Sequence, residues 1–481
     1  MAEQLKIWFI SAEVDPYAKT GGLGDIGNSL PKALRKLGHD VRIAMPAYKN
    51  IEEGYPDVTP SDISLEVELG VGKLPAGVFT GTLPNSDVPV YFIAEQNLFN
   101  RDTLYGYDDD VYRFAFFSIA ALQLTAVLNW KPDIVHAHDW HTAPALTWLS
   151  TAGQGLPHFQ GIASLFTIHN LAHQGRTDWN IFEYMGVQSH SLAEEAFGQV
   201  NFMARGIYHA TMVNTVSPTY AREITTVEGG AGMDGLLRHR QFDLHGILNG
   251  LDVDLWDPAI DTRLPSQFSA SNIHNRIHNR HALQNHSGLP QRDDIPLIAM
   301  ITRLDWQKGL DLTGHVLHRL LNNFAGEAQF IVLGTGASQY EQMMANFAQA
   351  YPSKMTAYLS YNAGFAPLIY GGCDIFLMPS LFEPCGLGQM IAMRYGAVPV
   401  VRATGGLADT VQEGHNGFVF GDYSGDAFWD ALSRAIYVFN VDKMRWHQIQ
   451  HNGMSTDFSW GNSAHGYEQL YEWAIARTLF G

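Results

Sequence analysis

A lysine followed by a glycine-rich turn is the first arrangement in the chain that could bind a phosphate. Lys19 precedes Gly21 and Gly22. The turn lies between an apolar segment, 7–10, and a helical pattern, 26–37. Glycine lets the backbone approach a ligand closely, and the unpaired N–H groups at a helix start attract anions. Since the turn matches neither a Walker A loop nor a strict dinucleotide fingerprint, we interpret it as a site for a phosphorylated or sugar-bearing ligand.

A second set of cations follows an apolar segment in the other half of the chain. Arg303 closes a predicted strand over 296–302, and Lys308 comes shortly after it. An arginine fork and a lysine point charge at a strand-to-helix turn can neutralise a diphosphate without a metal. For an isolated pair of this kind, a surface ion pair with Asp305 or Asp311 is the alternative.

Two further turns in the second half combine glycine with polar groups. Glu383 follows a predicted strand at 375–378 and precedes a glycine-containing turn at 384–388. This order offers a carboxylate to sugar hydroxyls while a helix start faces a phosphate. The turn 404–409 repeats the design after a predicted strand at 398–401. So many such turns in one half are hard to assign to packing alone.

Histidines end two predicted strands in the first half. His136, His138 and His141 surround Asp139, and His169 follows the next strand. The alternative is a metal site, because binuclear hydrolases use His-x-His-x-Asp-His, but Asp139 stands one position too early for that pattern. We therefore predict no metal, and we expect a neutral His169 to donate to a sugar oxygen.

Aromatic residues at turns are candidates for stacking on a base or a sugar. Tyr361 follows a predicted strand at 357–360, where it could stack on a nucleotide base. Tyr105 and Trp140 could pack against glucosyl rings of an acceptor. Most other aromatic side chains are expected in the core.

Composition restricts the class of protein that holds these residues. The chain has 481 residues, 46% of them hydrophobic and 16% charged, with a formal net charge of −18. This charge argues against nucleic-acid and anionic-membrane surfaces as partners. Cys373 and Cys385 form no disulfide framework and suit a reducing compartment. With no apolar run near ~20 residues, we expect no membrane span and a cytoplasmic location.

Two successive series of alternating strands and helices must position the candidate residues. Several predicted strands are apolar throughout, which favours parallel sheets covered by helices on both faces. We predict an α/β fold with two doubly wound, Rossmann-like domains that face a deep cleft. The first comprises 1–246 with a returning helix at 461–481, and the second comprises 247–460. A ligand held at strand ends of both domains accounts most simply for the positions of the motifs.

The chain resembles the bacterial glycogen synthase and plant starch synthase family of retaining glucosyltransferases. Motifs in the family's order cover nearly the whole chain: KTGGLGD at 19–25, HDWH at 138–141, TIHN at 167–170, VNTVSP at 213–218, GILNG at 246–250, RLDWQKG at 303–309, EPCGL at 383–387 and TGGLAD at 404–409. The resemblance implies the GT-B type of two-domain fold. It also implies transfer of glucose from ADP-glucose to the 4-hydroxyl end of an α-1,4-glucan, with no metal cofactor.

Site residues follow from the turns and the resemblance together. The predicted catalytic residues are Glu383, Asp139, His169, Arg303 and Lys308. The resemblance implies that Glu383 and His169 hold the glucose. The predicted donor-binding residues are Lys19, Gly21, Gly22, Asn249, Arg303, Lys308, Tyr361, Cys385, Gly386, Leu387, Thr404, Gly405 and Gly406.

Three positions depart from the wider pattern. Ile391 stands where many retaining transferases have a second carboxylate, which the starch synthase branch commonly lacks. Gly388 replaces a usual Thr, and Ala363 stands where a Glu often occurs. A UDP-glucose-dependent transferase and a non-catalytic glucan-binding relative are the alternatives. The sequence gives no indication of the oligomeric state.

Overall fold

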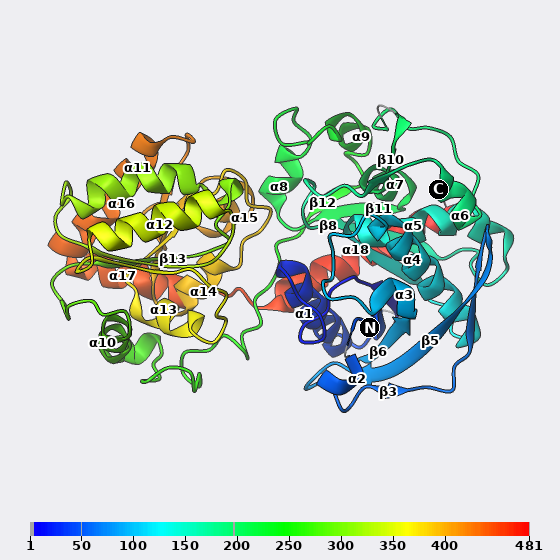
Figure 1. The fold of residues 1–481 in the computed structure, drawn as a ribbon, viewed down its shortest axis with the longest axis horizontal. Helices are drawn as coiled ribbons and strands as arrows, with labels where there is room; N and C mark the ends of the chain where they lie inside the picture. Colours follow the sequence, from blue (N-terminus) through cyan, green and yellow to red (C-terminus); the bar gives the residue numbers. More distant parts are fainter. Residues whose placement is uncertain (1–3, 50, 196–197, 481) are drawn as a thin grey trace. The chain divides into compact units, whose positions relative to one another are not determined.

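The computed structural model describes residues 4–49, 51–195 and 198–480, and the chain forms two compact units (Figure 1). Unit 1 comprises Met1–Gly250 with Trp460–Gly481, and unit 2 comprises Leu251–Ser459. The expected border between 246 and 247 lies a few residues before this division. Each unit contains a largely or wholly parallel sheet with helices on both faces, so the predicted pair of doubly wound α/β domains is confirmed.

Unit 1 is built on a 10-stranded sheet of order β12-β11-β8-β7-β1-β2-β6-β5-β3, in which β4 also pairs with β5. The strands from β12 to β6 pair in parallel, and β3, β4 and β5 add antiparallel pairs at one edge. The order reverses between β1 and β7, which is the switch point where open α/β sheets bind ligands. The bounds are β1 (Lys6–Ile10), β2 (Asp40–Pro46), β3 (Thr59–Pro60), β4 (Leu65–Leu69), β5 (Gly72–Thr82), β6 (Pro89–Ala94), β7 (Ile134–His138), β8 (Ala163–Ile168), β11 (Met212–Thr215) and β12 (Leu244–Gly246). A separate antiparallel pair is formed by β9 (Arg176–Thr177) and β10 (Val200–Asn201).

Helices cover both faces of the unit 1 sheet (Figure 1). The two that pack together on one face are α1 and α18, and α4, α5 and α7 form the other layer. The chain returns to unit 1 through α18, which contacts β8 and β11. The bounds are α1 (Gly22–Lys36), α2 (Ile51–Gly54), α3 (Gln96–Phe99), α4 (Asp110–Val127), α5 (Asp139–Leu149), η1 (Ala152–Gly155), α6 (Asn180–Met185), α7 (Phe202–His209), α8 (Pro218–Glu223), α9 (Asp234–His239) and α18 (Trp460–Phe480).

The sequence predicts no membrane span, but helix α4 is long and apolar enough to be a candidate for one. By length and composition alone it could cross a bilayer, but 72% of it is buried inside the unit. Its side chains, among them Phe114, Phe116 and Phe117, belong to the core cluster of unit 1. An apolar helix that is hydrophobic all round is typical of a protein core, and α4 is such a helix.

Unit 2 is built on a 6-stranded sheet of order β15-β14-β13-β16-β17-β18. All its pairs are parallel, and the strands are β13 (Leu297–Ile301), β14 (Gln329–Leu333), β15 (Met355–Tyr358), β16 (Ile375–Met378), β17 (Val398–Arg402) and β18 (Phe418–Phe420). Counted along the unit, this is the Rossmann order 3-2-1-4-5-6. Its switch point lies between β13 and β16, so residues that follow these two strands are placed beside one another.

Two layers of helices enclose the unit 2 sheet (Figure 1). One layer contains α11, α12 and α16, and the other contains α10, α13, α14 and α17. The bounds are η3 (Ala270–Asn275), α10 (Arg276–His286), η4 (Trp306–Lys308), α11 (Leu310–Leu321), α12 (Ser338–Ala350), α13 (Ala366–Gly372), α14 (Gly388–Arg394), α15 (Gly405–Thr410), α16 (Gly425–Val441) and α17 (Lys443–Ser455).

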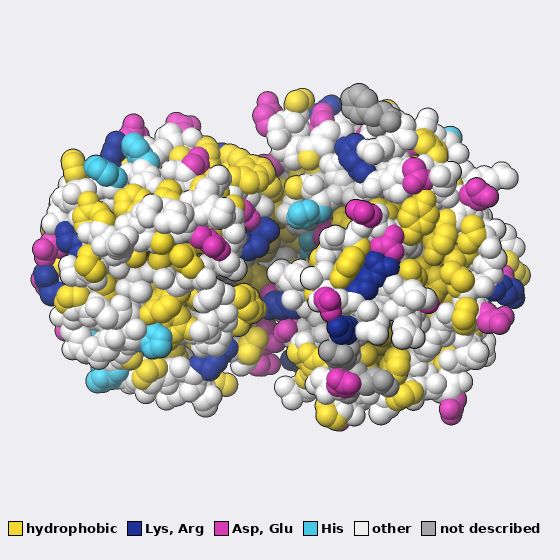
Figure 2. Space-filling view, in the orientation of Figure 1, with side chains coloured by type: hydrophobic (Ala, Val, Ile, Leu, Met, Phe, Trp, Pro, Cys, Tyr) yellow, Lys and Arg dark blue, Asp and Glu magenta, His cyan; other side chains and the backbone are white. Residues whose placement is uncertain are grey.

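Charged side chains are mixed on the face that Figure 2 draws. Lys and Arg are scattered among Asp and Glu on each unit and form no continuous basic patch on this face (Figure 2). The cations of the candidate site therefore act locally within an acidic chain, whose formal charge is −18.

Candidate functional site

Lys308 and Glu383 form an ion pair at the switch point of unit 2. Lys308 ends η4 after β13, and Glu383 lies in the loop after β16. Lys308 Nζ is 2.6 Å from Glu383 Oε2, and both side chains are largely buried. The pair thus places a cation and a carboxylate together at the edge of the sheet where ligands bind in this fold.

Arg303 lies at the same edge but is directed more to solvent. Its side chain is 60% exposed and is 3.4 Å from Asp305 in a loose ion pair. The Asp305 carboxylate also accepts a hydrogen bond from the N–H of Lys308 and so caps η4. The alternative of a surface ion pair with Asp305 is therefore present, yet an exposed ion pair contributes little and leaves the guanidinium free to bind an anion.

The backbone of the Glu383 loop is held by the turn that begins α15. The N–H of Gly406 donates to the carbonyl oxygens of Glu383 and Pro384 at 3.1 and 3.2 Å. A Cβ on Gly405 would overlap the Glu383 carbonyl oxygen, and one on Gly406 would overlap that of Cys385. These glycines therefore allow two turns to touch, which gives them a positioning role. Their expected contact with a donor stays a prediction.

Other side chains around this loop are buried, and one of them was missed by the sequence reasoning. Cys385 and Thr404 are buried, Gly386 has a φ of +72°, and Leu387 is the N-cap of α14. Gln389 was not predicted, yet its Nε2 donates to the carbonyl oxygens of Cys385 and Gly386 at 3.2 and 2.8 Å. A glutamine in the first helical turn after Gly386 was visible in the sequence, but its type and position do not identify these partners.

The remaining predicted positions of unit 2 either follow β15 or lie in α14. Tyr361 follows β15 and is 79% exposed, so its ring is open to stacking. Ala363 is also exposed. Gly388 begins α14, and a Cβ there would lie 3.2 Å from the Phe376 ring, so this position favours a small residue. Ile391 is buried, which leaves no room for an exposed carboxylate at that turn of α14.

In unit 1, the turn at Lys19 lies after β1 and is exposed. Lys19 forms an ion pair with Asp25 across the first turn of α1. Nothing lies within 4 Å of a Cβ added to Gly21 or Gly22. The packing of the protein therefore does not explain why both residues lack a side chain, whereas the close approach of a ligand would.

Glu13 organises this turn and was not predicted from the sequence. Its buried carboxylate accepts hydrogen bonds from the N–H groups of Thr20 and Gly21 at 2.7 and 3.2 Å. It also accepts one from the Tyr105 hydroxyl at 2.8 Å. A carboxylate shortly after the first strand was the available signal, because this position adjoins the switch point of the sheet.

Asp139 and His169 are brought together by the neighbouring strands β7 and β8. The Asp139 carboxylate accepts hydrogen bonds from the N–H groups of His169 and Asn170 at 2.7 and 3.3 Å. Burial raises the pKa of Asp139 to about 7 and lowers the pKa of His169 to about 3. His169 is therefore neutral near pH 7, as the sequence predicts, and Asp139 can hold a proton near that pH.

His138 and His169 are joined by a hydrogen bond between their rings. His138 Nδ1 lies 2.9 Å from His169 Nε2, and burial lowers the pKa of His138 well below its usual value. Since both rings are neutral, one must donate and the other accept, so their tautomers are coupled. His169 Nδ1 is buried without a hydrogen-bond partner among the described residues, so it can serve a ligand.

The histidines considered for a metal site do not converge. His136 contacts the Tyr471 hydroxyl and Thr167 Oγ1 at 2.8 and 2.6 Å. His141 instead stacks on Trp140, with ring centroids 4.1 Å apart. Within residues 4–49, 51–195 and 198–480, no group of three or more His, Cys, Asp or Glu is arranged to hold a metal ion.

Trp140 does not fit the expected stacking on an acceptor sugar. It is only 9% exposed, and its ring lies on His141. A Cβ on Gly175 would overlap the Trp140 ring, so the backbone of Gly175 also presses on it. Trp140 therefore packs in the core, while Tyr105 is half-buried and holds Glu13.

Asn249 lies near the end of the first part of unit 1. It is 3% exposed, and its Oδ1 has no hydrogen-bond partner in the described chain. A buried amide oxygen without a partner is costly, so this atom is suited to accept a hydrogen bond from a ligand.

Two family models match the chain. The model described as starch synthase catalytic domain matches residues 6–239, within unit 1. The model described as glycosyl transferases group 1 matches residues 283–437, within unit 2.

Individual relatives match over almost the whole length. A glycogen synthase of Moorella thermoacetica is 43% identical, covering 99% of this chain and 98% of that protein. A glycogen synthase of Thermotoga maritima is 40% identical, covering 98% of this chain and 100% of that protein. The catalytic domain of starch synthase IV from Arabidopsis thaliana, bound to ADP and acarbose, superposes with a TM-score of 0.90 at 36% identity, covering 98% of this chain and 100% of that one.

Proposed function

The chain belongs to the glycogen synthase and starch synthase family of glycosyltransferases, and from this premise we propose that it transfers glucose from ADP-glucose to an α-1,4-glucan. The acceptor is the non-reducing 4-hydroxyl end, and the configuration at the anomeric carbon is retained. Its two Rossmann-like units have the GT-B fold. The reaction would serve glycogen synthesis in the cytoplasm.

The observation that carries this proposal is the ion pair of Lys308 and Glu383 at the switch point of unit 2. The pair lies between the ends of β13 and β16, where a nucleotide-sugar would present its phosphates and hexose. A cation suits the phosphates, and a carboxylate suits the sugar hydroxyls. Lys308 Nζ and Glu383 Oε2 are 2.6 Å apart, so one ligand could contact both.

Cleavage of the sugar–phosphate bond builds negative charge on the leaving diphosphate and positive charge on the glucose ring. Arg303 and Lys308 would stabilise the diphosphate more strongly in the transition state than in the bound donor, which is what lowers the barrier. Glu383 would hold the glucose hydroxyls. We propose attack by the acceptor hydroxyl on the face that the diphosphate leaves, assisted by the leaving phosphate.

The unit 1 residues are proposed to act on the same two substrates. Lys19 would bind the donor diphosphate, with the backbone at Gly21 and Gly22 approaching it. His169 Nδ1 would form a hydrogen bond with the glucose, because no described residue occupies it. Asp139 holds the His169 backbone and would lie near the reacting sugar.

The test compares single variants in an assay of glucose transfer to glycogen. Lys308→Ala and Arg303→Ala should each lower kcat by about a hundredfold or more, as expected for the loss of a charge that stabilises the transition state. Lys354→Ala is the matched control, since Lys354 is bound to Leu321 and Asn323 rather than to the switch point. Full activity in both site variants would refute the assignment, and an inactive wild-type protein would favour the non-catalytic relative.

A second arm of the assay compares donors. The related starch synthase structure contains ADP, which supports an adenine nucleotide as donor. Tyr361 is exposed for stacking on a base but does not distinguish adenine from uracil. We expect kcat/KM to be higher with ADP-glucose than with UDP-glucose, and the reverse order would establish the UDP-glucose alternative.

A further inference from the structure

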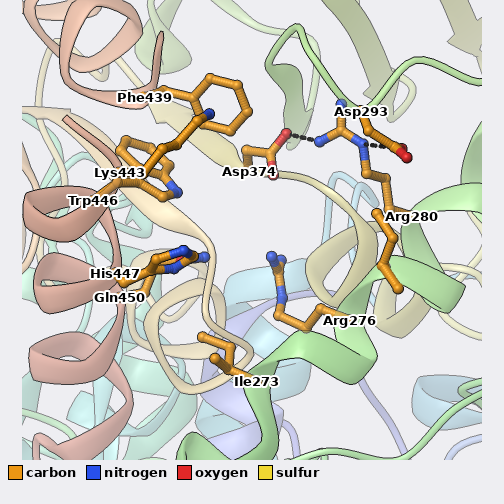
Figure 3. A pocket seen from close by; sticks show the side chains of 11 residues that line it. Ile273, Arg276, Arg280, Asp293, Asp374, Phe439, Lys443, Trp446, His447 and Gln450 are labelled. Atoms are coloured by element: carbon orange, nitrogen blue, oxygen red, sulfur yellow. Dashed lines mark hydrogen bonds and ion pairs between the residues drawn. The ribbon is translucent and has the colours of Figure 1, made fainter. Parts of the chain in front are cut away.

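A cavity lies in unit 2, away from the switch point. It is bordered by α10, by the start of β16 and by the joint between α16 and α17, and its volume is about 250 Å³. Figure 3 shows the side chains around it, with an open centre. Because Asp374 precedes β16 whereas Glu383 follows it, the cavity adjoins the opposite end of this strand from Glu383. We call it the α10–α17 pocket, lined by Ile273, Arg276, Ile277, Arg280, Asp293, Asp374, Phe439, Lys443, Trp446, His447 and Gln450.

The floor of the α10–α17 pocket contains a buried arginine, and no carboxylate of the described residues forms an ion pair with it. Arg276 is 7% exposed, and its guanidinium donates to the carbonyl oxygens of Tyr370, Cys373 and Tyr395. These contacts use Nε and one terminal nitrogen, and Figure 3 shows the tip of the guanidinium directed into the cavity. Burial lowers the pKa of Arg276, as expected for a charge taken out of water.

The acids of the pocket are already bound to other cations. Asp374 is paired with Arg280 and also accepts a hydrogen bond from the N–H of Leu297. Asp293 is exposed at the rim, where it is paired with His281 at 2.8 Å and lies 3.9 Å from Arg280. Within the described chain, neither acid lies within ion-pair distance of Arg276.

The rim adds a second cation with no acid. Lys443 Nζ lies 3.6 Å from the centroid of the Phe439 ring, and in the described residues no carboxylate forms an ion pair with it. Partial burial beside the Phe439 ring lowers the pKa of Lys443. In Figure 3, the Lys443 side chain ends against the Phe439 ring, and Lys443 and His447 lie across the open centre from Arg276.

These charges favour an anion as the occupant. A buried charge is costly unless it is paired, which applies to Arg276, and the exposed Lys443 adds a second cation at the rim; among the described residues neither has a bound carboxylate. The volume lies below the ~300–1,000 Å³ of pockets for larger ligands, so the anion must be small. The wall of Phe439 and Trp446 could pack against a small organic substituent, whereas their burial leaves no exposed ring face for a glucan chain.

We propose that the α10–α17 pocket binds a phosphate group, either inorganic phosphate or the phosphate of a small phosphomonoester, between Arg276 and Lys443. Arg276 would form a hydrogen bond with the phosphate through the nitrogen left free by the carbonyl contacts. Lys443 would close over it from the rim, and His447 would add a donor. This site is distinct from the donor site, which lies at the other end of β16.

The experiment measures binding to the full chain by isothermal titration calorimetry at constant ionic strength. The probes are inorganic phosphate and glucose 6-phosphate, each against wild-type protein, Lys443→Ala, Arg445→Ala and Lys308→Ala. Lys443 is exposed, so its variant should fold. Arg445→Ala is the matched control, because this substitution removes a positive charge from the same helix, and Arg445 does not line the pocket. Lys308→Ala reports any phosphate bound at the donor site.

We expect Lys443→Ala to weaken phosphate binding about tenfold, as for loss of one charge-assisted hydrogen bond, while Arg445→Ala and Lys308→Ala retain it. Tighter binding of glucose 6-phosphate than of phosphate, lost in Lys443→Ala, would identify a phosphomonoester, and equal binding would identify phosphate itself. The proposal is overturned if neither probe binds, if Lys443→Ala binds as the wild type does, if Arg445→Ala weakens binding equally, or if Lys308→Ala abolishes it.

Discussion

The tetrapeptide TGGL occurs once in each unit, and the two copies have opposite environments. In unit 1 it spans 20–23, where Thr20, Gly21 and Gly22 are exposed. In unit 2 it spans 404–407 and is buried. A Cβ on either glycine of the first copy would meet open space, whereas one on either glycine of the second would overlap backbone carbonyl oxygens. The same residues therefore have different reasons to be glycine.

The two turns contain glycine for different structural reasons. The exposed turn keeps its surface free, so its glycines are explained by something that binds there. The buried turn lets α15 contact the Glu383 loop, so its glycines are explained by the position of that carboxylate. Substitutions at the two copies should accordingly change different quantities.

The largest effect is expected in the buried copy. Gly405 has a φ of +44°, and a side chain there would overlap the Glu383 carbonyl oxygen. Gly405→Ala should lower the free energy of unfolding by about 3 kcal/mol or more and should lower kcat at least tenfold, because the loop must shift. Chemical denaturation and the transfer assay would measure both. Unchanged stability would show that the two turns can separate without cost.

The exposed copy should lose activity without losing stability. Gly22→Ala places a methyl group where a ligand is proposed to approach, so kcat/KM for the donor should fall about tenfold. Stability should stay the same or rise by up to ~1 kcal/mol, since Ala replaces Gly at the start of a helix. Gly235→Ala in α9 is the control, because a Cβ there also meets open space. Wild-type kinetics in Gly22→Ala would contradict the proposal that a ligand binds at this turn.

A smaller effect is expected from the carboxylate that holds the exposed turn. Glu13→Gln keeps the shape but weakens the hydrogen bonds from Thr20, Gly21 and Tyr105. We expect a loss of about 1–2 kcal/mol in the free energy of unfolding and a several-fold rise in KM for the donor. Tyr105→Phe removes one of these contacts, and a double-mutant cycle would show whether the two residues are coupled. Additive effects would place Tyr105 outside this network.

The last prediction concerns Asp139, the buried acid of unit 1, and its effect depends on pH. Glu383 is paired with a lysine, whereas the Asp139 carboxylate accepts hydrogen bonds from N–H groups and has no ion pair among the described residues. Burial raises the pKa of Asp139 from 3.8 to about 7. Between these values the folded protein keeps a proton that the unfolded chain has released. The free energy of unfolding should therefore fall as pH rises from about 4 to 7, by at most ~1.4 kcal/mol per pH unit, and then stay level.

Asp139→Asn removes this titration. Urea denaturation of both proteins between pH 4.5 and 8.5 would give the stability difference, wild type minus variant. It should decrease up to about pH 7 and be constant above it. A difference that does not vary with pH would mean that Asp139 is ionised throughout the range.

Several features could be predicted from the sequence because they depend on local patterns. Apolar runs with helical stretches between them predicted two parallel α/β sheets, and each motif lies where a strand ends. Glu13 and Gln389 were missed because a single polar residue carries no local signal of its partners, which are distant in the chain or in the backbone. Trp140 was misinterpreted because the contact with Gly175 that covers its ring is made by a loop elsewhere in the unit.

By itself, the order of residues along this chain determined the fold class, the family and the set of polar groups at strand ends, since these follow from periodicity and from motifs of contiguous residues. Tertiary structure alone decided which TGGL turn is exposed and which is buried, which histidine nitrogen is left for a ligand, and which pocket cations lack a carboxylate. Burial and hydrogen-bond partners depend on segments that are distant in the chain and meet only when it folds.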